Sequence, residues 1–326
     1  MNIYDIAREA NVSIATVSRV LNGKPNIHPA TAQRVRDVLE KYQYTPSRIA
    51  RGLATSSMRL VGVVMHDLQN THYTAAAYVV EQELAAVGYR CLLCNTAPEA
   101  MEETLKMLAE SRVDGLILIG SIFAQHWTEA ALQRYFPEQP VVIINGTLPL
   151  PNVTGILCDE ADGILQCAAH LWNRAHRRIA YVHDNTTDSA MRKLTGYRQA
   201  AARFGFPEQV LTCDTGFAGG IELGRRILAL DGRSFDALVF AEDTTALGCI
   251  RPLERSGIRI PEELAVTGYT NTMFAQMASR TLTSIDEQVH VLGSEAVCAF
   301  RSRINGNAAE AASITVPVHL VVGETT

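Results

Sequence analysis

The chain has 326 residues, of which 47% are hydrophobic and 19% are charged. This composition is typical of a globular protein with about two domains and excludes a fibrous or disordered chain. The net charge of −5 is divided unevenly, because the first 60 residues hold nine basic and four acidic side chains and the rest hold 20 basic and 30 acidic ones. A small basic segment ahead of a larger acidic body indicates a polyanion-binding module joined to something else.

No export or membrane-spanning signal is present, because charged residues occur within the first nine positions and no run of about 18 uncharged apolar residues exists. We therefore expect a cytoplasmic protein with reduced cysteines and no membrane association. Cys91 and Cys94 form a CxxC pair, but we expect segment 89–95 to be a buried strand. No second pair completes a zinc site, so we expect core thiols on opposite faces and neither a metal nor a cofactor.

The basic segment predicts three short helices. Residues 4–10 form the first, and Asn11 follows where a tight turn requires a positive φ, which asparagine tolerates. Ser13 is a suitable N-cap for the second helix. The third helix begins near Pro29, a residue suited to the first helical position, and we expect Tyr42 on its apolar face.

The second helix has the composition of a DNA recognition helix. Its exposed face carries Ile14, Ala15, Ser18 and Arg19, and the N–H groups of its first turn suit phosphate. The aliphatic side chains can contact thymine methyl groups, and Arg19 can pair bidentately with guanine. This combination predicts a helix-turn-helix that reads the major groove, with a solvated helical bundle as the alternative.

The segment from Tyr4 to Asn22 closely resembles the DNA-binding head of the lactose/galactose repressor (LacI/GalR) family, above all in the run Thr-Val-Ser-Arg-Val-Leu-Asn at 16–22. Asn11 is a departure, because the family usually has glycine there. The resemblance implies a helix-turn-helix DNA-binding domain at 1–45 and a hinge helix or linker at 46–59.

The hinge segment is too short to be stable alone. Its eight residues 47–54 fall below the about 12–15 at which an isolated helix is marginal. We therefore expect it to fold only on DNA, with an ordinary linker as the alternative. In the family, paired hinge helices lie in the minor groove, where a leucine at the position of Leu53 enters a base step. The residues expected to contact DNA are Tyr4, Ser13, Ile14, Ala15, Thr16, Ser18, Arg19, Asn22, Ser47, Arg48, Ala50, Arg51 and Leu53.

From Leu60 onward, short apolar runs alternate with helical patterns. The expected strands are 61–65, 89–94, 115–120, 141–145, 155–157, 179–182, 211–213, 237–240, 265–268 and 318–322. The expected helices are 75–87, 99–110, 162–172, 189–204, 218–230, 244–256 and 289–304. This alternation predicts an α/β core of two doubly wound parallel-sheet lobes, which bind ligands beyond the carboxyl ends of their strands.

The family resemblance continues through this core and implies a periplasmic-binding-protein-like fold for effector binding and dimerisation at 60–326. The first subdomain would contain about 60–157 and 288–315. The second would contain about 158–287 and 316–326, with three crossovers between the two.

The resemblance also implies an effector pocket between the lobes. Its residues would be Asp67, His72, Tyr73, Asn145, Asp159, Ser189, Lys193, Thr215, Phe217, Glu242 and Thr270. Lys193 stands where the family usually has an arginine, whereas Asn145 and Thr270 stand where acids are usual. Loss of up to two acids with retention of a cation favours an acidic or phosphorylated effector over a neutral carbohydrate, with ordinary sequence drift as the alternative.

We find no GxxxxGK[ST], GxGxxG, GxSxG or HExxH motif and expect no enzymatic activity. The predicted function is that of a homodimeric repressor on a pseudo-palindromic operator, controlled by a sugar or sugar-derived effector. Within the family, the alternatives are an activator or global regulator with a protein co-regulator, or a response to a nucleoside or purine. From other classes, they are an enzyme with an appended DNA-binding head and a solute-binding protein for transport.

Overall fold

The structure is a computed structural model and describes residues 2–21, 27–44, 57–306 and 312–326. It divides into two compact units, Met1–Arg59 and Leu60–Thr326, and each unit has its own hydrophobic core. No helix among the described residues is long and apolar enough to cross a membrane.

The described residues of the first unit form three helices, α1 (Ile3–Glu9), α2 (Ile14–Leu21) and α3 (Pro29–Lys41), here called the head. Ile6, Val17 and Val35, one from each helix, are fully buried and belong to one core. Asn11 has a φ of 51°, and the Ser13 hydroxyl accepts a hydrogen bond from the Thr16 N–H at 3.2 Å. The predicted turn and N-cap are therefore confirmed, as is proline at the start of α3.

The prediction that Tyr42 faces the core is wrong, because its side chain is 41% exposed. Helix α3 ends at Lys41, so the helical period no longer sets the direction of the next side chain. The Lys41 ammonium lies 4.8 Å from the centre of the Tyr42 ring. Tyr44 packs against the core of the head instead.

The hinge helix expected within 46–59 falls mostly outside the described residues. The same holds for six of the expected DNA contacts: Asn22, Ser47, Arg48, Ala50, Arg51 and Leu53.

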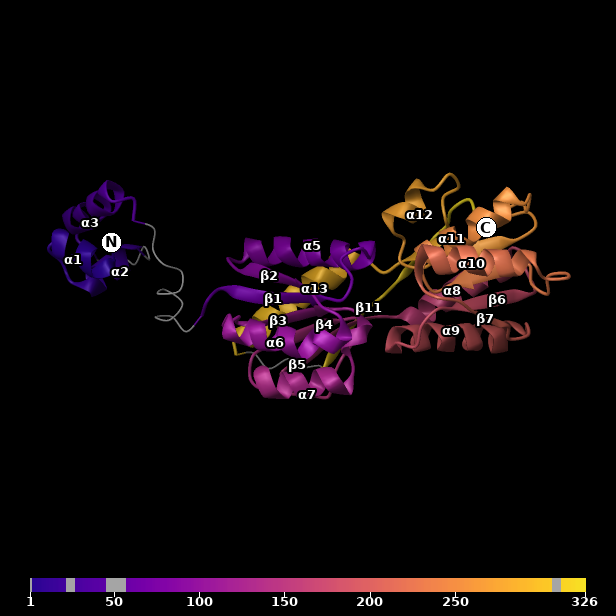
Figure 1. The fold of residues 1–326 in the computed structure, drawn as a ribbon, viewed down its shortest axis with the longest axis horizontal. Coiled ribbons are helices and arrows are strands. Elements are labelled where there is room, and N and C mark those ends of the chain that lie inside the picture. Colours follow the sequence, from indigo (N-terminus) through magenta and orange to yellow (C-terminus); the bar gives the residue numbers. More distant parts are fainter. Residues whose placement is uncertain (1, 22–26, 45–56, 307–311) are drawn as a thin grey trace. The chain divides into compact units, whose positions relative to one another are not determined.

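In its described residues, the second unit contains two parallel sheets, which confirms the predicted doubly wound α/β core (Figure 1). The larger sheet has the order β11-β5-β4-β3-β1-β2, and the smaller has the order β7-β6-β8-β9. The strands of the larger sheet are β1 (Leu60–Met65), β2 (Arg90–Asn95), β3 (Gly115–Ile119), β4 (Val141–Ile144), β5 (Val153–Cys158) and β11 (Ser313–Val316). Those of the smaller sheet are β6 (Ile179–His183), β7 (Val210–Thr212), β8 (Ala237–Phe240) and β9 (Ala265–Thr267).

Helices cover both faces of each sheet, as Figure 1 shows. On the larger sheet, α5 (Thr71–Ala86) and α13 (Val289–Ile304) cover one face, and α6 (Met101–Glu110) and α7 (His126–Tyr135) cover the other. On the smaller sheet, α8 (Glu160–Asn173) and α9 (Asp188–Phe204) lie opposite α10 (Gly216–Leu228) and α11 (Asp243–Arg255). Strand periodicity produces this layering: Val63 packs into the core beside α5, and Val64 packs into the core beside α6.

The chain passes between the two sheets three times: after β5, before α13 and after β11. Two short strands, β10 (Ser284–Asp286) and β12 (His319–Val321), pair antiparallel at these passages. The remaining elements are α12 (Met273–Met277) and the 3₁₀ turns η1 (Pro98–Ala100) and η2 (Ser121–Phe123). Among these elements, α7, α12, β10 and β11 were not predicted from the sequence pattern.

The strand that carries Cys91 and Cys94 is not buried, contrary to the prediction, because β2 lies at one edge of its sheet and is only partly covered. Cys91 packs toward the core beside α5 and Cys94 toward the core beside α6, so their opposite directions are confirmed. Both thiols are free, and partial burial raises the pKa of each. No group of three His, Cys, Asp or Glu side chains in the described part of the chain could hold a metal ion.

Helices α10 and α11 approach so closely that glycine is required at their contact. A Cβ at Gly220 would overlap the carbonyl oxygen of Thr245, and one at Gly248 would overlap that of Phe217. We predict that Gly220→Ala destabilises the core by about 2 kcal/mol through overpacking, although helix propensity alone would favour alanine by about 1 kcal/mol. Urea unfolding measures the effect, with exposed Glu222→Ala on the same helix as the control. A Gly220→Ala variant as stable as the wild type would contradict this packing.

Candidate functional site

The first candidate site is the exposed face around the start of α2. Tyr4 is 65% exposed and Ile14 is 39% exposed, and Ser13, Ala15 and Arg19 are exposed as well. Thr16 and Ser18 are half-buried. The first turn of α2 contains no acidic residue, so its N–H groups can meet a phosphate without charge repulsion. Those residues predicted to contact DNA that the structure describes therefore all belong to the head, and their side chains are at least partly exposed.

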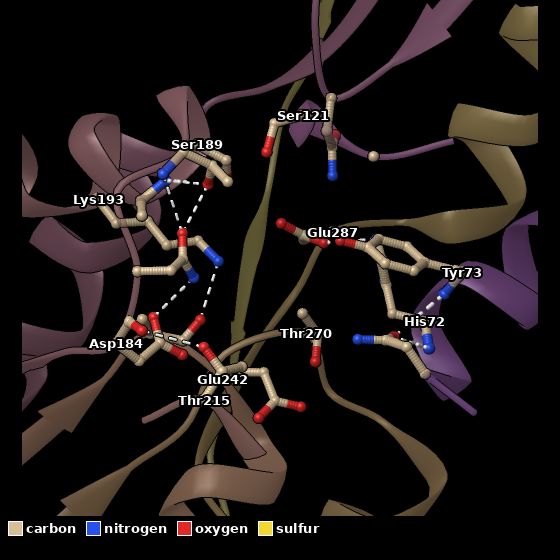
Figure 2. A pocket seen from close by; sticks show the side chains of 17 residues that line it. His72, Tyr73, Ser121, Asp184, Ser189, Lys193, Thr215, Glu242, Thr270 and Glu287 are labelled. Carbon is tan, nitrogen blue, oxygen red and sulfur yellow. Dashed lines mark hydrogen bonds and ion pairs between the residues drawn. The ribbon is translucent and has the colours of Figure 1, made fainter. Parts of the chain in front are cut away.

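The second candidate site is a cavity of about 100 Å³ between the two lobes of the second unit, here called the inner cavity (Figure 2). His72 and Tyr73 face Ser189 and Lys193 across it, as Figure 2 shows. Its lining residues are Asn70, His72, Tyr73, Gly120, Ser121, Asn145, Asp184, Asn185, Thr187, Ser189, Ala190, Lys193, Thr215, Ala241, Glu242, Thr270 and Glu287.

Most of the expected effector residues come together in this cavity. Eight line it: His72, Tyr73, Asn145, Ser189, Lys193, Thr215, Glu242 and Thr270. Asp67 and Phe217 line a neighbouring cavity instead. Asp159 lines neither cavity, because it is the N-cap of α8 and its carboxylate accepts from the Asp162 N–H at 3.1 Å.

The neutral residues Asn145 and Thr270 do not leave this cavity without acids. Three carboxyl groups line the inner cavity, those of Asp184, Glu242 and Glu287, against the single ammonium of Lys193. Burial raises the pKa of the Asp184 carboxyl, and the positive charge of Lys193 partly opposes that shift. The cavity is therefore rich in hydrogen-bond acceptors and carries little positive charge.

The Lys193 ammonium is already engaged by the protein. The side chain is buried, and Nζ donates to the Ala241 carbonyl at 2.9 Å. The same ammonium lies 3.8 Å from the centre of the fully buried Tyr269 ring. A carbonyl and an aromatic face together stabilise the charge, which leaves it less available to an anionic ligand.

Several buried polar groups of the cavity lack hydrogen-bond partners among the described residues. Asn145 Oδ1 and His72 Nδ1 have none. His72 Nε2 and Glu287 Oε2 approach to 3.0 Å, but the alignment is not that of a hydrogen bond. Because buried polar groups are nearly always satisfied, these atoms indicate a place for a polar ligand.

A partly buried ion pair lies beside the cavity, and its arginine reaches across to the other lobe. The Arg192 guanidinium donates to both carboxylate oxygens of Glu160, each at 2.8 Å, and to the Asn145 carbonyl at 3.2 Å. Glu160 is fully buried at the start of α8, and Asn145 follows β4 of the larger sheet. Arg192 therefore bridges the lobes and does not line the inner cavity.

The fully buried carboxylate of Asp243 holds one wall of the cavity. Thr270 has a φ of 98°, a strained conformation for a β-branched residue. Asp243 accepts from the Thr270 hydroxyl at 3.4 Å, from the Thr272 N–H at 2.6 Å and hydroxyl at 2.9 Å, and from the Ser284 hydroxyl at 2.6 Å. These bonds fix the loop after β9 against β10, so the strain at Thr270 is offset by its surroundings.

Sequence reasoning missed Asp184, Glu287, Asn70 and Ser121. Asp184 and Ser121 follow closely after β6 and β3, so the rule that ligands meet the carboxyl ends of strands could have found them. Asn70 caps α5. Glu287 follows β10, a three-residue strand with no readable pattern.

The neighbouring cavity, here called the outer cavity, has a volume of about 600 Å³. It is lined by His66, Asp67, Gln69, Asn70, Thr71, Tyr73, Ile122, Asn185, Thr187, Thr215, Gly216, Phe217, Glu242, Thr244 and Phe274. Burial lowers the pKa of His66, which favours the neutral imidazole there.

A three-helix head with an exposed recognition helix and a two-lobed core with a polar interlobe cavity define a ligand-responsive DNA-binding regulator. The model for bacterial regulatory proteins of the lacI family matches residues 2–47, and that for the periplasmic binding protein-like domain matches residues 168–326. The chain is 35% identical over 314 residues to an HTH-type transcriptional regulator of Lachnoclostridium phytofermentans, covering 94% of both chains. It therefore belongs to the LacI family of bacterial transcriptional regulators.

Solved structures of transcriptional regulators share this fold. The Lac repressor dimer bound to operator and the anti-inducer ONPF has a TM-score of 0.88 at 24% identity, with 100% of this chain and 98% of that chain covered. The complex of the transcriptional regulator CelR with cellobiose has a TM-score of 0.74 at 26% identity, with both chains covered completely.

The buried Asp243 makes the stability of the core depend on pH. Burial, partly opposed by the hydrogen bonds from Ser284 and Thr272, raises the pKa of Asp243 to about 7. A raised pKa means that the folded state binds the proton more tightly, so this contribution to stability is present at low pH and is lost as the pH rises through about 7. We predict that the free energy of unfolding falls by about 2–3 kcal/mol from this group between pH 5 and 8.

The Asp243→Asn variant cannot ionise at this position and should show a flatter pH dependence. Urea unfolding at several pH values measures the slope, with exposed Asp231→Asn as the matched control. Identical slopes for Asp243→Asn and the wild type would show that Asp243 does not titrate in this range.

Proposed function

We propose that the protein is a homodimeric transcriptional repressor whose affinity for its operator is controlled by a neutral, hydroxyl-rich small molecule, a sugar or sugar derivative, in the inner cavity. It would act in the cytoplasm and would have no enzymatic activity. The observation that carries the proposal is the lining of the inner cavity, in which carboxylates, amides and hydroxyls outnumber the single ammonium.

Each polar group of the lining suits a sugar hydroxyl. A hydroxyl donates to a carboxylate such as Asp184 and accepts from an amide such as that of Asn70, and charge-assisted bonds of this kind are the stronger ones. A phosphorylated or carboxylated ligand would meet Asp184, Glu242 and Glu287 and would be repelled. CelR, which binds cellobiose, supports the carbohydrate class by its similar fold.

DNA recognition by a dimer follows from the small size of the head. One recognition helix reads a few base pairs, whereas two heads related by a two-fold axis read two half-sites of a pseudo-palindrome. The Lac repressor dimer on its operator supports this arrangement. Phosphate contacts would supply salt-dependent affinity, and Ile14, Ala15 and Arg19 would supply base readout.

Ligand and DNA would be coupled through the relative position of the two lobes. The inner cavity takes residues from both, so a bound ligand stabilises one lobe arrangement over another. That arrangement would set the spacing of the paired heads and the folding of the hinge segment. The coupling must be reciprocal: operator and effector change each other's affinity by the same factor.

The DNA-binding face is tested with Arg19→Ala. The DNA probe is an operator that the wild-type protein selects from a randomised duplex library. We predict that Arg19→Ala binds this operator about 10–100-fold more weakly and discriminates less between bases at one position of each half-site. Fluorescence anisotropy at fixed salt measures both effects. The control is Arg34→Ala, an equal charge change at an exposed position of α3. An equal loss in both variants would mean that Arg19 contributes only charge.

The effector class is tested by thermal shift and calorimetry on the full chain. We expect at least one neutral sugar to raise the melting temperature, and we expect phosphorylated and carboxylated sugars to fail. Asp184→Asn should weaken sugar binding about tenfold, since it exchanges a charged acceptor for a neutral one. Asp188→Asn, at an exposed position outside both cavities, is the control. Stabilisation by anionic sugars alone would contradict the proposal.

A further inference from the structure

The inner and outer cavities are neighbours that share part of their walls. Their shared lining residues are Asn70, Tyr73, Asn185, Thr187, Thr215 and Glu242. The inner cavity, at about 100 Å³, is smaller than the range of about 300–1,000 Å³ that small-molecule sites usually occupy. The outer cavity, at about 600 Å³, lies within that range. A ligand confined to the inner cavity would leave the larger part of the space to water.

The outer cavity differs from the inner one in carrying exposed aromatic rings. Phe217 in the first turn of α10 is 43% exposed, and Phe274 in α12 is 47% exposed. Neither ring belongs to a buried core of the described residues. The Arg251 guanidinium lies 5.7 Å from the centre of the Phe217 ring and helps to hold it in place. Large apolar rings left in contact with water at a cavity indicate a binding surface.

The same cavity also carries hydrogen-bonding groups. Asp67, Gln69 and Thr244 line it together with the two rings. A pyranose ring matches this mixture: its axial C–H groups form apolar faces that an aromatic ring attracts, and its equatorial hydroxyls bond to polar groups at the edge. A purely apolar group would leave the carboxylate and amide without partners, and an anion would meet Asp67 and Glu242.

We propose that the effector has at least two sugar units, with one in the inner cavity and the second in the outer cavity against Phe217 and Phe274. The proposal rests on the proposed function and deepens it from a sugar to a disaccharide or longer glycan. Phe274 is then a residue that determines effector length, because it lines only the outer cavity. The carboxylates of the inner cavity would bind the first sugar unit, which monosaccharides and disaccharides have in common.

The test uses calorimetric titration of the full-length protein with neutral monosaccharides and the disaccharides that contain them: glucose with cellobiose and maltose, and galactose with lactose and melibiose. At least one disaccharide should bind ten or more times as tightly as its monosaccharides. Phe274→Ala should reduce the ratio of disaccharide to monosaccharide affinity about tenfold. Phe274→Tyr keeps the aromatic face and should therefore keep the wild-type ratio. Asp184→Asn should weaken binding of both ligand sizes and keep the ratio.

Met277→Ala is the matched control. Met277 lies on α12 with Phe274, is 74% exposed and lines neither cavity. Its replacement should leave both affinities unchanged. Equal affinity for monosaccharide and disaccharide, or an affinity ratio unchanged by Phe274→Ala, would overturn the proposal of a two-unit effector. Binding of a monosaccharide in those cases would still support the proposed function. Failure of every sugar of either size to bind would overturn both.

Discussion

Parallel strand pairing is the constraint on which the rest of the second unit depends. In each sheet the carboxyl ends of the strands lie at one edge, so the loops after them converge. Asn145 follows β4, Asp184 follows β6, and Thr270 follows β9 closely. Three passages of the chain between the sheets bring the two edges to a common cavity. The functional side chains thus come from positions far apart in the sequence.

A second constraint is that the walls of the cavity are held by buried charges. Asp243 fixes the loop that carries Thr270 against β10. Glu160 holds Arg192, and the hydrogen bond from Arg192 to the Asn145 carbonyl connects the lobes. Buried charges of this kind are costly unless fully hydrogen-bonded, and here the bonds are present. Asn145 and Thr270 line the inner cavity, so a ligand there touches residues that these contacts hold in place.

Much of this organisation could be predicted from local sequence. The turn at Asn11 and the cap at Ser13 depend on conformational preferences of single residues, and the main strands follow from apolar runs. Tyr42 could not be placed, because its direction depends on where α3 ends. The edge position of β2 depends on the sheet order, which a strand's own residues do not encode. The resemblance compared single positions of the cavity, such as Asn145 and Thr270, and did not count all of its carboxyl groups. Asp184 and Glu287 enter from loops that it did not mark, and only the fold brings them there.

Under the proposed function, the head and the core are linked by thermodynamic coupling between operator binding and sugar binding. The most direct test is the affinity of the full chain for its tightest-binding sugar, measured by titration with and without a saturating amount of operator duplex. Reciprocal coupling predicts a change in sugar affinity of about fivefold or more, equal to the factor by which the sugar changes operator affinity. Equal sugar affinity in the presence and absence of operator would contradict it.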